Sequence, residues 1–289
     1  MSDTPVRLAL IGRPEDIDVW AAVAPRVAGV VISVVADSME AALGESGADF
    51  DAVTVASYAE AQVAVAAGKH ALVDAPVAES LDQIEGLLKV CRQTGVGLGV
   101  GRSSCHRPAN QVILDRLKTG KLGAPGLCRV HRWGSEERSL AEAIYGDIDF
   151  ALEVFGGPPT EVYALSRDGA YRQVHLGFPE GGMAIFDYAA SLPEGQAYDS
   201  LSLIGSAGAA YADDHHNTQL LLAGGGTQAL ISDSGSGALQ QLQAFVDEVA
   251  SQEGDSARIH RVHQVIECVR QSMATEQVLK EQGGDYVAA

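Results

Sequence analysis

Ionisable residues of the kinds that bind ligands or transfer protons stand where apolar runs of the sequence end. Asp37 closes one such run and Asp74 closes another. An acid at the end of a buried parallel strand can bind the hydroxyl groups of a ribose, so Asp37 would favour NAD over NADP if a dinucleotide binds. Asp37 is equally suited to cap the helix expected after it, which leaves both roles open.

A turn with one glycine, one proline and two acids follows the first apolar run. A dinucleotide-binding turn reads G-x-G-x-x-G, because glycines let the backbone approach the pyrophosphate at a helix N-terminus. Gly12 fits the first position, whereas Pro14 takes the second and Ile17 the third. At about 5 Å, the carboxylates of Glu15 and Asp16 would each cost about 1–3 kcal/mol against a phosphate charge. The simpler interpretation is a helix that supplies its own anions to its dipole.

The elements that must position these residues alternate between short apolar runs and amphipathic stretches through residue 120. This alternation predicts a parallel sheet with strands at 6–11, 30–36, 52–56, 70–73 and 96–100 and helices at 14–24, 58–67, 80–94 and 108–119. Further strands are predicted at 126–133, 160–166, 172–178, 182–190 and 198–205. Helices are predicted at 148–155 and from 239 to about 280, the second broken near Gly254. The fold class is therefore α/β, with a Rossmann-type parallel-sheet domain at 1–122 and an α+β domain with an open, mostly antiparallel sheet at 123–289.

Several segments resemble, in the right order, those of the Gfo/Idh/MocA oxidoreductases, the family of glucose–fructose oxidoreductase and inositol dehydrogenase. They are Ala67-Gly68-Lys69-His70 with Asp74-Ala75-Pro76-Val77-Ala78, then 117–123, 201–208 and 263–278. The resemblance implies a Rossmann domain followed by an α/β domain, and NAD(P)-linked chemistry on a sugar-like or cyclic alcohol or ketone. It also implies a homo-oligomer, a dimer or tetramer, that covers the open sheet of the second domain.

The catalytic positions of the family are changed in this sequence. The family's lysine in its Glu-Lys-Pro stretch is replaced by Ala75, which cannot relay a proton. Its paired aspartate and histidine correspond here to Glu142 and Gly146. Tyr145, Glu142 and His106 are the candidates for a replacement acid, although a packed Tyr145 and a solvated Glu142 are the simpler interpretations.

The resemblance also indicates which residues would contact a ligand. Cofactor contacts, if a dinucleotide binds, fall on Gly12, Asp37, Ser57, Asp74 and Pro76. Substrate contacts fall on Arg102, Arg107, Asp149, His131 and His175. Such a basic lining would suit an anionic small ligand, and the alternative is that the strand residues among them point to solvent.

Two histidine-bearing segments raise the question of a metal site. Residues 213–216 hold two aspartates and two histidines, and His260 and His263 are spaced for one helical turn. A solvated turn and a solvated helix face explain both segments more simply, so no metal site is predicted. The four cysteines have no paired spacing, which favours a reducing compartment.

The composition is strongly acidic, with 38 acidic against 20 basic residues and a net charge of −18. Such a surface repels nucleic acid and anionic membranes, which excludes both as main partners. No apolar run approaches the length of a membrane span and no export signal is evident, so a cytoplasmic location is expected.

Two functions remain open. The changed glycine turn, lysine and histidine favour a divergent homologue that has given up the standard reaction and binds a small ligand or acts as an oligomeric partner. This hypothesis expects no cofactor. The alternative is an atypical NAD(P)-dependent oxidoreductase that uses Asp37 for the ribose and a nonstandard acid such as Tyr145 or His106.

Overall fold

The computed structural model describes residues 4–44, 49–101, 103–135, 138–193, 197–213, 218–223, 227–229, 236–251 and 256–289. The chain divides into two compact units, Met1–His106 with Ser234–His263, and Arg107–Asp233 with Gln264–Ala289. This division differs from the predicted boundary after residue 122. Residues 107–122 belong to the second unit, and a segment near the C-terminus returns to the first.

The first unit is built on a parallel sheet with strand order β2-β1-β3-β4-β5. Its strands are β1 (Val6–Ile11), β2 (Val30–Ala36), β3 (Ala52–Val55), β4 (His70–Val73) and β5 (Leu98–Val100). Its helices are α1 (Pro14–Val23), the 3₁₀ turn η1 (Ala24–Arg26), α2 (Met39–Gly44), α3 (Tyr58–Ala66), α4 (Leu81–Thr94), α5 (Ser103–His106), α8 (Ser236–Ser251) and the first turns of α9 (Ser256–Thr275). The predicted α/β class is confirmed, and β1 is buried along Leu8–Ile11 as expected for a sheet covered on both faces.

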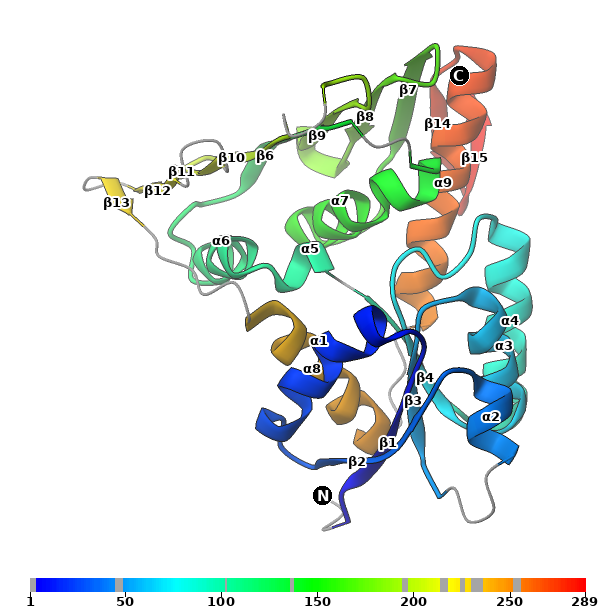
Figure 1. The fold of residues 1–289 in the computed structure, drawn as a ribbon. Coiled ribbons are helices and arrows are strands. Elements are labelled where there is room, and N and C mark those ends of the chain that lie inside the picture. The colour runs from blue at the N-terminus through cyan, green and yellow to red at the C-terminus, as the bar shows by residue number, and fades with distance from the viewer. Residues whose placement is uncertain are drawn as a thin grey trace. The chain divides into compact units, whose positions relative to one another are not determined.

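Helix α8 completes the core of the first unit although it follows β5 by more than a hundred residues in the chain. Leu242, Phe245 and Val246 of α8 are buried in one apolar cluster with Leu8 and Trp20. Figure 1 shows the two helices, α1 in blue and α8 in gold, side by side. This packing explains why the segment from residue 234 belongs with the N-terminal sheet.

The second unit carries a sheet with strand order β13-β12-β11-β10-β6-β9-β8-β7-β14-β15. The strands are β6 (Pro125–Trp133), β7 (Glu161–Arg167), β8 (Tyr171–Gly177), β9 (Met183–Ala189), β10 (Tyr198–Gly205), β11 (Gly208–Asp213), β12 (Thr218–Ala223), β13 (Thr227–Ala229), β14 (Leu279–Gln282) and β15 (Asp285–Ala288). Neighbouring strands run antiparallel except for the parallel pair β6 and β9. The helices are α6 (Pro108–Lys118), the 3₁₀ turn η2 (Pro179–Gly181), α7 (Leu140–Phe155) and the later turns of α9.

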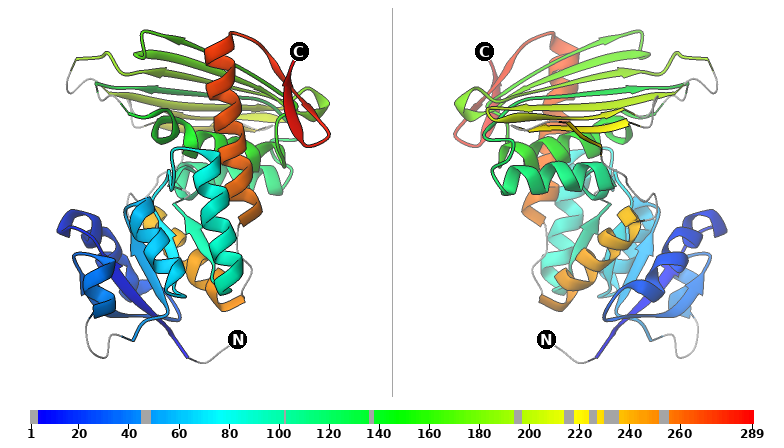
Figure 2. Two further views of the ribbon diagram at one scale, coloured as in Figure 1. Left: turned by 90° about the vertical axis from the view of Figure 1, so that its right-hand side faces the viewer. Right: turned by 90° about the vertical axis from the view of Figure 1, so that its left-hand side faces the viewer.

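Helices cover one face of this second sheet, as Figure 2 shows for α6 and α7. Cys128 and Val130 of β6 and Phe186 of β9 are fully buried on that face. The residues between them point the other way, because side chains alternate along a strand. No helix among the described residues covers this other side, which we call the open face.

Candidate functional site

The carboxyl edge of the first sheet collects the residues predicted to contact a cofactor. Gly12 follows β1, Asp37 follows β2, Ser57 follows β3, and Asp74 with Pro76 follows β4. Because these strands are parallel and adjacent, their carboxyl ends lie at one edge. The amide of Gly12 donates to the carbonyl of Ala36 at 3.1 Å, so Gly12 lies beside the residue that precedes Asp37.

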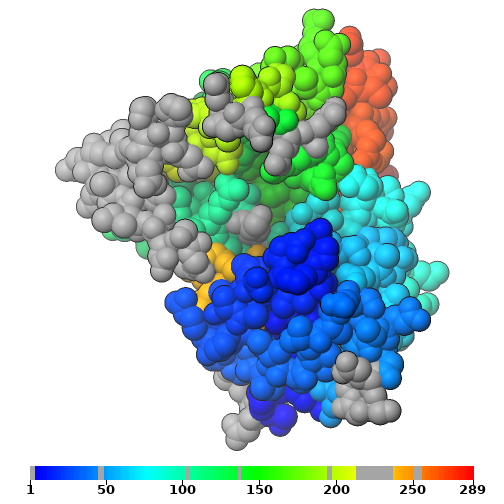
Figure 3. All heavy atoms as spheres, viewed as in Figure 1, coloured from blue at the N-terminus to red at the C-terminus, as the bar shows by residue number. Residues whose placement is uncertain are grey.

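The first turn of α1 is occupied by its own charged side chains. Gly12 has a φ of 139°, and a Cβ placed there would lie 3.3 Å from Cβ and 3.6 Å from Oδ2 of Asp16. Arg13 donates from Nε to Oδ2 of Asp16 at 3.0 Å, and its guanidinium lies 3.0 Å from Oε1 of Glu15. The hydrogen bond from Arg13 lowers the pKa of Asp16, which is therefore an anion at neutral pH. In Figure 3 this start of the chain, in dark blue, forms exposed surface.

The other predicted cofactor residues at this edge differ in how they are engaged. Asp37 is exposed, and no described residue bonds to its carboxylate; the capping role falls to Ser38, whose Oγ accepts from the amide of Ala41 at 3.2 Å. Ser57 caps α3 by accepting from the amide of Glu60. Reduced hydration, followed by the nearby Asp16 carboxylate, raises the pKa of Asp74.

Gln241 of α8 also reaches this edge, although no motif in the sequence indicated it. Its side chain is 7% exposed, and its Nε2 has no hydrogen-bond acceptor among the described residues. A Cβ placed at Gly101 would lie 3.1 Å from this Nε2 and 3.1 Å from the amide nitrogen of Ala75. The amide of Gln241 therefore lies beside Ala75, the position at which the resembling family carries its lysine. The chain distance between the two residues explains why sequence spacing could not reveal that both border Gly101.

A buried polar cluster in the second unit centres on Asp147 of α7. Asp147 is 3% exposed; its Oδ1 accepts from Arg132 of β6 at 2.9 Å, and its Oδ2 accepts from the hydroxyl of Tyr188 of β9 at 3.1 Å. Burial alone would lower the pKa of Arg132, but the carboxylates of Asp147 and Asp199 outweigh it and raise that pKa. Burial and the Asp147 carboxylate raise the pKa of Tyr188 well above its ordinary value. The cluster therefore holds a permanent cation and a neutral phenol around one carboxylate.

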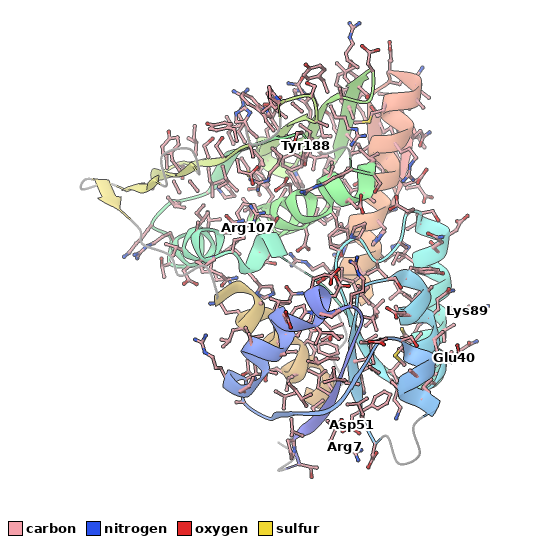
Figure 4. All side chains as sticks on the ribbon, viewed as in Figure 1. Arg7, Glu40, Asp51, Lys89, Arg107 and Tyr188 are labelled. Carbon is pink, nitrogen blue, oxygen red and sulfur yellow. The ribbon has the colours of Figure 1, made fainter. Side chains whose placement is uncertain are left out.

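This cluster continues to the surface through Asp199 of β10. Oδ2 of Asp199 lies 3.5 Å from the guanidinium of Arg132 and 3.7 Å from that of Arg107 at the start of α6. The Arg107 side chain is 47% exposed. Figure 4 labels Tyr188 on the sheet and Arg107 beside α6. Two arginines, two aspartates and a tyrosine thus form one chain of donors and acceptors that ends in solvent.

The two histidines predicted as substrate contacts lie on the open face instead. His131 alternates with Arg132 on β6, so it points away from α7. Its Nδ1 lies 3.2 Å from Oδ2 of Asp187, and this oxygen accepts a hydrogen bond from Arg129 at 3.1 Å. Burial lowers the pKa of His131. His175 of β8 points to the same face, where its ring contacts that of Tyr163.

The remaining predicted residues have the following places. Glu142 forms a capping box with Ser139, accepting from its amide at 2.9 Å, so it stabilises the start of α7. Tyr145 is 2% exposed and Asp149 is 1% exposed, both within α7. His106 is the last residue of α5. Arg102 lies outside the described residues.

The described residues contain no group of three metal-ligating side chains arranged to hold an ion. Residues 214–216 of the histidine-bearing segment lie outside the described ranges. His260 lies 3.0 Å from Glu85, and His263 is buried with its Nδ1 2.9 Å from the carbonyl of Ile259. The four cysteines are buried and form no disulfide bond. Among the described helices, none combines the length and apolar character needed to cross a bilayer.

Comparisons with known proteins identify the fold. A scan against models of protein families finds no match. A 150-residue stretch is 31% identical to 1,5-anhydro-D-fructose reductase of Ensifer adhaerens, and it spans 45% of this chain and 44% of the reductase. The chain therefore matches less than half the length of that relative.

Solved structures match over nearly the whole chain. An oxidoreductase from Agrobacterium radiobacter, solved with NAD⁺, L-tartaric acid and magnesium, superposes with a TM-score of 0.81 at 16% identity, over 96% of this chain and 98% of that one. A dehydrogenase from Chromobacterium violaceum gives 0.81 at 16% identity, over 95% and 97%. The UDP-N-acetylglucosamine 3-dehydrogenase of Acidithiobacillus ferrooxidans gives 0.77 at 18% identity, over 94% and 99%. The predicted resemblance to the Gfo/Idh/MocA oxidoreductases is confirmed, and the chain has their fold.

Proposed function

We propose that this chain binds a small hydroxyl-rich ligand on the Gfo/Idh/MocA fold and does not carry out NAD(P)-linked hydride transfer. The observation that carries the proposal is the place of the Asp16 carboxylate, which lies against Gly12 and is bonded to Arg13. In a Rossmann fold, the pyrophosphate approaches the backbone at this glycine and the following helix N-terminus.

Three features at this edge of the sheet oppose the binding of a pyrophosphate. Pro14 provides no amide hydrogen at the first helix position. The carboxylates of Asp16 and Glu15 are already paired with Arg13, so this guanidinium is committed to neutralising them. Asp74 adds a third carboxyl group at the same edge, close enough to Asp16 to respond to its charge.

The polar cluster of the second unit supports the ligand-binding part of the proposal. Asp199 and Arg107 present an acceptor and a donor at the surface, and Arg132 connects them to Asp147. Paired carboxylates and guanidinium groups accept and donate to the neighbouring hydroxyl groups of a polyol. Because the four charges of this chain cancel, a neutral ligand fits it better than an anion.

A second candidate is an atypical oxidoreductase that uses NAD. Asp37 favours it, since this exposed carboxylate at the end of β2 has no partner among the described residues and is suited to ribose hydroxyls. The partial match to an anhydrofructose reductase points the same way. Ala75 offers no proton relay, so this candidate needs an acid from elsewhere.

Calorimetric titration with NAD⁺, NADH, NADP⁺ and NADPH separates the two candidates. We expect no binding of any of them to the wild-type protein at micromolar concentration. The variant Pro14→Gly/Asp16→Ala should bind NAD⁺ about 5- to 150-fold more tightly than wild type, which is the factor that removing one carboxylate at about 5 Å provides. The control Glu79→Ala removes an exposed acid elsewhere in the same unit and should leave binding unchanged.

Micromolar binding of NAD⁺ by the wild-type protein, lost in Asp37→Ala, would refute the proposal and establish the oxidoreductase candidate. A polyol and sugar screen with the Asp199→Ala variant then tests the ligand-binding part. A wild-type protein that responds to no polyol, or an Asp199→Ala variant that responds equally, would contradict it.

We also propose that two or more copies associate through the open face of the second sheet. That face exposes large apolar side chains, among them Trp133, Met183 and Ile204. Large apolar side chains that are exposed on one face of a sheet can mark a protein–protein contact. Arg129, His131 and Gln173 converge on Asp187 in the middle of it.

A further inference from the structure

A cavity of about 320 Å³ lies in the first unit, away from the residues considered so far. It is bordered by the end of α4, by the later turns of α8 and by the start of β5. His70 is the first residue of β4 and Gly97 immediately precedes β5, so the cavity lies at the amino ends of these strands. Asp74 and Gly101 stand at their carboxyl ends. The cavity is therefore on the opposite edge of the sheet from Gly12 and Gln241.

One wall of the cavity is apolar and shaped by glycine. Phe245, Leu98 and Val249 line it. A Cβ at Gly99 would lie 2.7 Å from the ring of Phe245, so the glycine lets this ring lie directly on the edge strand. Cavities of this size and character are at the lower end of those that hold small organic molecules.

The polar side of the cavity presents hydrogen-bond donors. Nδ1 of His70 accepts from the amide of Gly97 at 2.9 Å, so a neutral ring carries its proton on Nε2. No described residue accepts a hydrogen bond from that Nε2. Arg92 also lines the cavity, and its guanidinium makes no ion pair with any part of the chain that the structure describes. An arginine with no ion pair to a described residue is unexpected in a protein with 38 acidic side chains.

The charges of the described lining leave room for one negative charge on the ligand, because Arg92 forms no ion pair with Glu248. Among the described residues that line the cavity, Arg92 is the one permanent cation and Glu248 is the one carboxylate. Burial raises the pKa of the Cys91 thiol to about 11, so this group is neutral. A guanidinium binds one carboxylate through two parallel hydrogen bonds, whereas a phosphate dianion would meet Glu248 with its second charge uncompensated.

We propose that this cavity binds a small carboxylic acid with an apolar body, with the carboxylate on Arg92 and His70 and the body on Phe245, Leu98 and Val249. The site is separate from the carboxyl edge of the sheet and does not depend on the function proposed above. Because the ligand would contact α4, α8 and β5 together, its binding stabilises the first unit against unfolding.

The test compares acids with neutral molecules of the same shape. Benzoate and hexanoate are titrated into the full chain by calorimetry at about 150 mM salt, where charges beyond about 8 Å are screened and the net charge of the protein matters little. Benzamide and hexanamide are the neutral counterparts. We expect the two acids to bind and to raise the melting temperature, and the two amides to bind at least tenfold more weakly.

Two variants on α4 form a matched pair. Arg92→Gln should weaken benzoate binding at least tenfold, the usual effect of removing one charged hydrogen-bond partner. Lys89→Gln removes the same charge from the exposed side of the same helix, labelled in Figure 4, and should leave binding unchanged. Val249→Trp, which fills the cavity, should abolish binding of both acids.

Three results would overturn the proposal: no response to either acid, equal binding of acids and amides, or equal losses in Arg92→Gln and Lys89→Gln. Tighter binding of phenyl phosphate than of benzoate would overturn the carboxylate assignment. Arg92 is exposed, so the comparison stands even where Val249→Trp does not fold.

Discussion

The hydroxyl of Tyr188 donates to Oδ2 of Asp147 at 3.1 Å and thereby connects strand β9 of the second unit to helix α7. Arg132 donates to the other oxygen of the same carboxylate at 2.9 Å. Each buried charge of this cluster needs its partner, because a charge left without a partner in a protein interior is strongly destabilising.

Asp147→Ala should therefore lower the free energy of unfolding by about 3–5 kcal/mol, since it leaves Arg132 buried without its nearest partner. Tyr188→Phe removes one neutral donor and should cost about 1–2 kcal/mol. Urea denaturation measures both. Glu161→Ala breaks the exposed pair with Lys280 and should cost less than about 1 kcal/mol. If Asp147→Ala and Glu161→Ala lowered the free energy of unfolding equally, the buried cluster would not stabilise the fold as stated.

Two glycines of the first unit should respond in opposite directions to alanine. A Cβ at Gly99 would lie 2.7 Å from the Phe245 ring and 3.2 Å from Leu72, so Gly99→Ala should cost about 1–3 kcal/mol through overpacking. Gly86 is exposed in the interior of α4 with nothing within 4 Å of its Cβ position. Gly86→Ala should stabilise the helix by about 1 kcal/mol. Thermal unfolding of the two variants decides the matter, and a stabilised Gly99→Ala protein would contradict the packing of α8 on β5.

Acid should destabilise the protein through His263. Burial lowers the pKa of this histidine in the folded chain, whereas the unfolded chain titrates near about 6.5. As the pH falls below that value, the unfolded state binds a proton that the folded state does not bind. The free energy of unfolding therefore falls by up to about 1.4 kcal/mol per pH unit. Urea unfolding at pH 7.5 and 5.5 should show a smaller pH dependence in His263→Asn than in wild type. His175→Gln is the control for loss of a histidine, and an unchanged slope in His263→Asn would refute the prediction.

Association through the open face should be visible at micromolar concentration. We expect sedimentation velocity to show a dimer or tetramer, and we expect Trp133→Glu/Ile204→Glu to shift it toward the monomer by placing charges in an apolar contact. Val19→Glu places a charge on an exposed apolar residue of α1 and should change nothing. A wild-type monomer would exclude this proposal.

Much of the fold could be predicted from the sequence because each βαβ unit is encoded locally. The spacing of apolar residues, with a period of two in strands and 3.6 in helices, placed β1, β2 and β4 correctly. Ser80, which caps α4, and Gly95, which follows it, are the residues that limit this helix. The C-terminal end was less accessible. A helix was expected to residue 280, but α9 ends at Thr275, and the positive φ values of Gly283 and Gly284 turn β14 into β15. The glycine pair was the available signal for this hairpin.

The site was predicted less well, for a physical reason. Residues that end neighbouring parallel strands must meet at one edge, so Gly12, Asp37 and Asp74 could be grouped from the sequence. The contacts of Gln241 with the Ala75 edge and of Asp147 with Tyr188 join segments far apart in the chain. No local period encodes such contacts. Side chains alternate between the two faces of a strand, but this alternation does not tell which face the helices cover. His131 and Arg132 are neighbours on β6 and lie on opposite faces for this reason.

The return of α8 to the first unit has a consequence for synthesis of the chain. Leu8, Leu10 and Trp20 leave the ribosome well before Leu242, Phe245 and Val246, which complete their core. At about 5–20 residues per second, the nascent chain carries this incomplete core for roughly ten to forty-five seconds. During that time the apolar side of α1 and β1 is exposed to other nascent chains and to chaperones, so truncation before α8 should yield an aggregating fragment rather than a free-standing nucleotide-type domain.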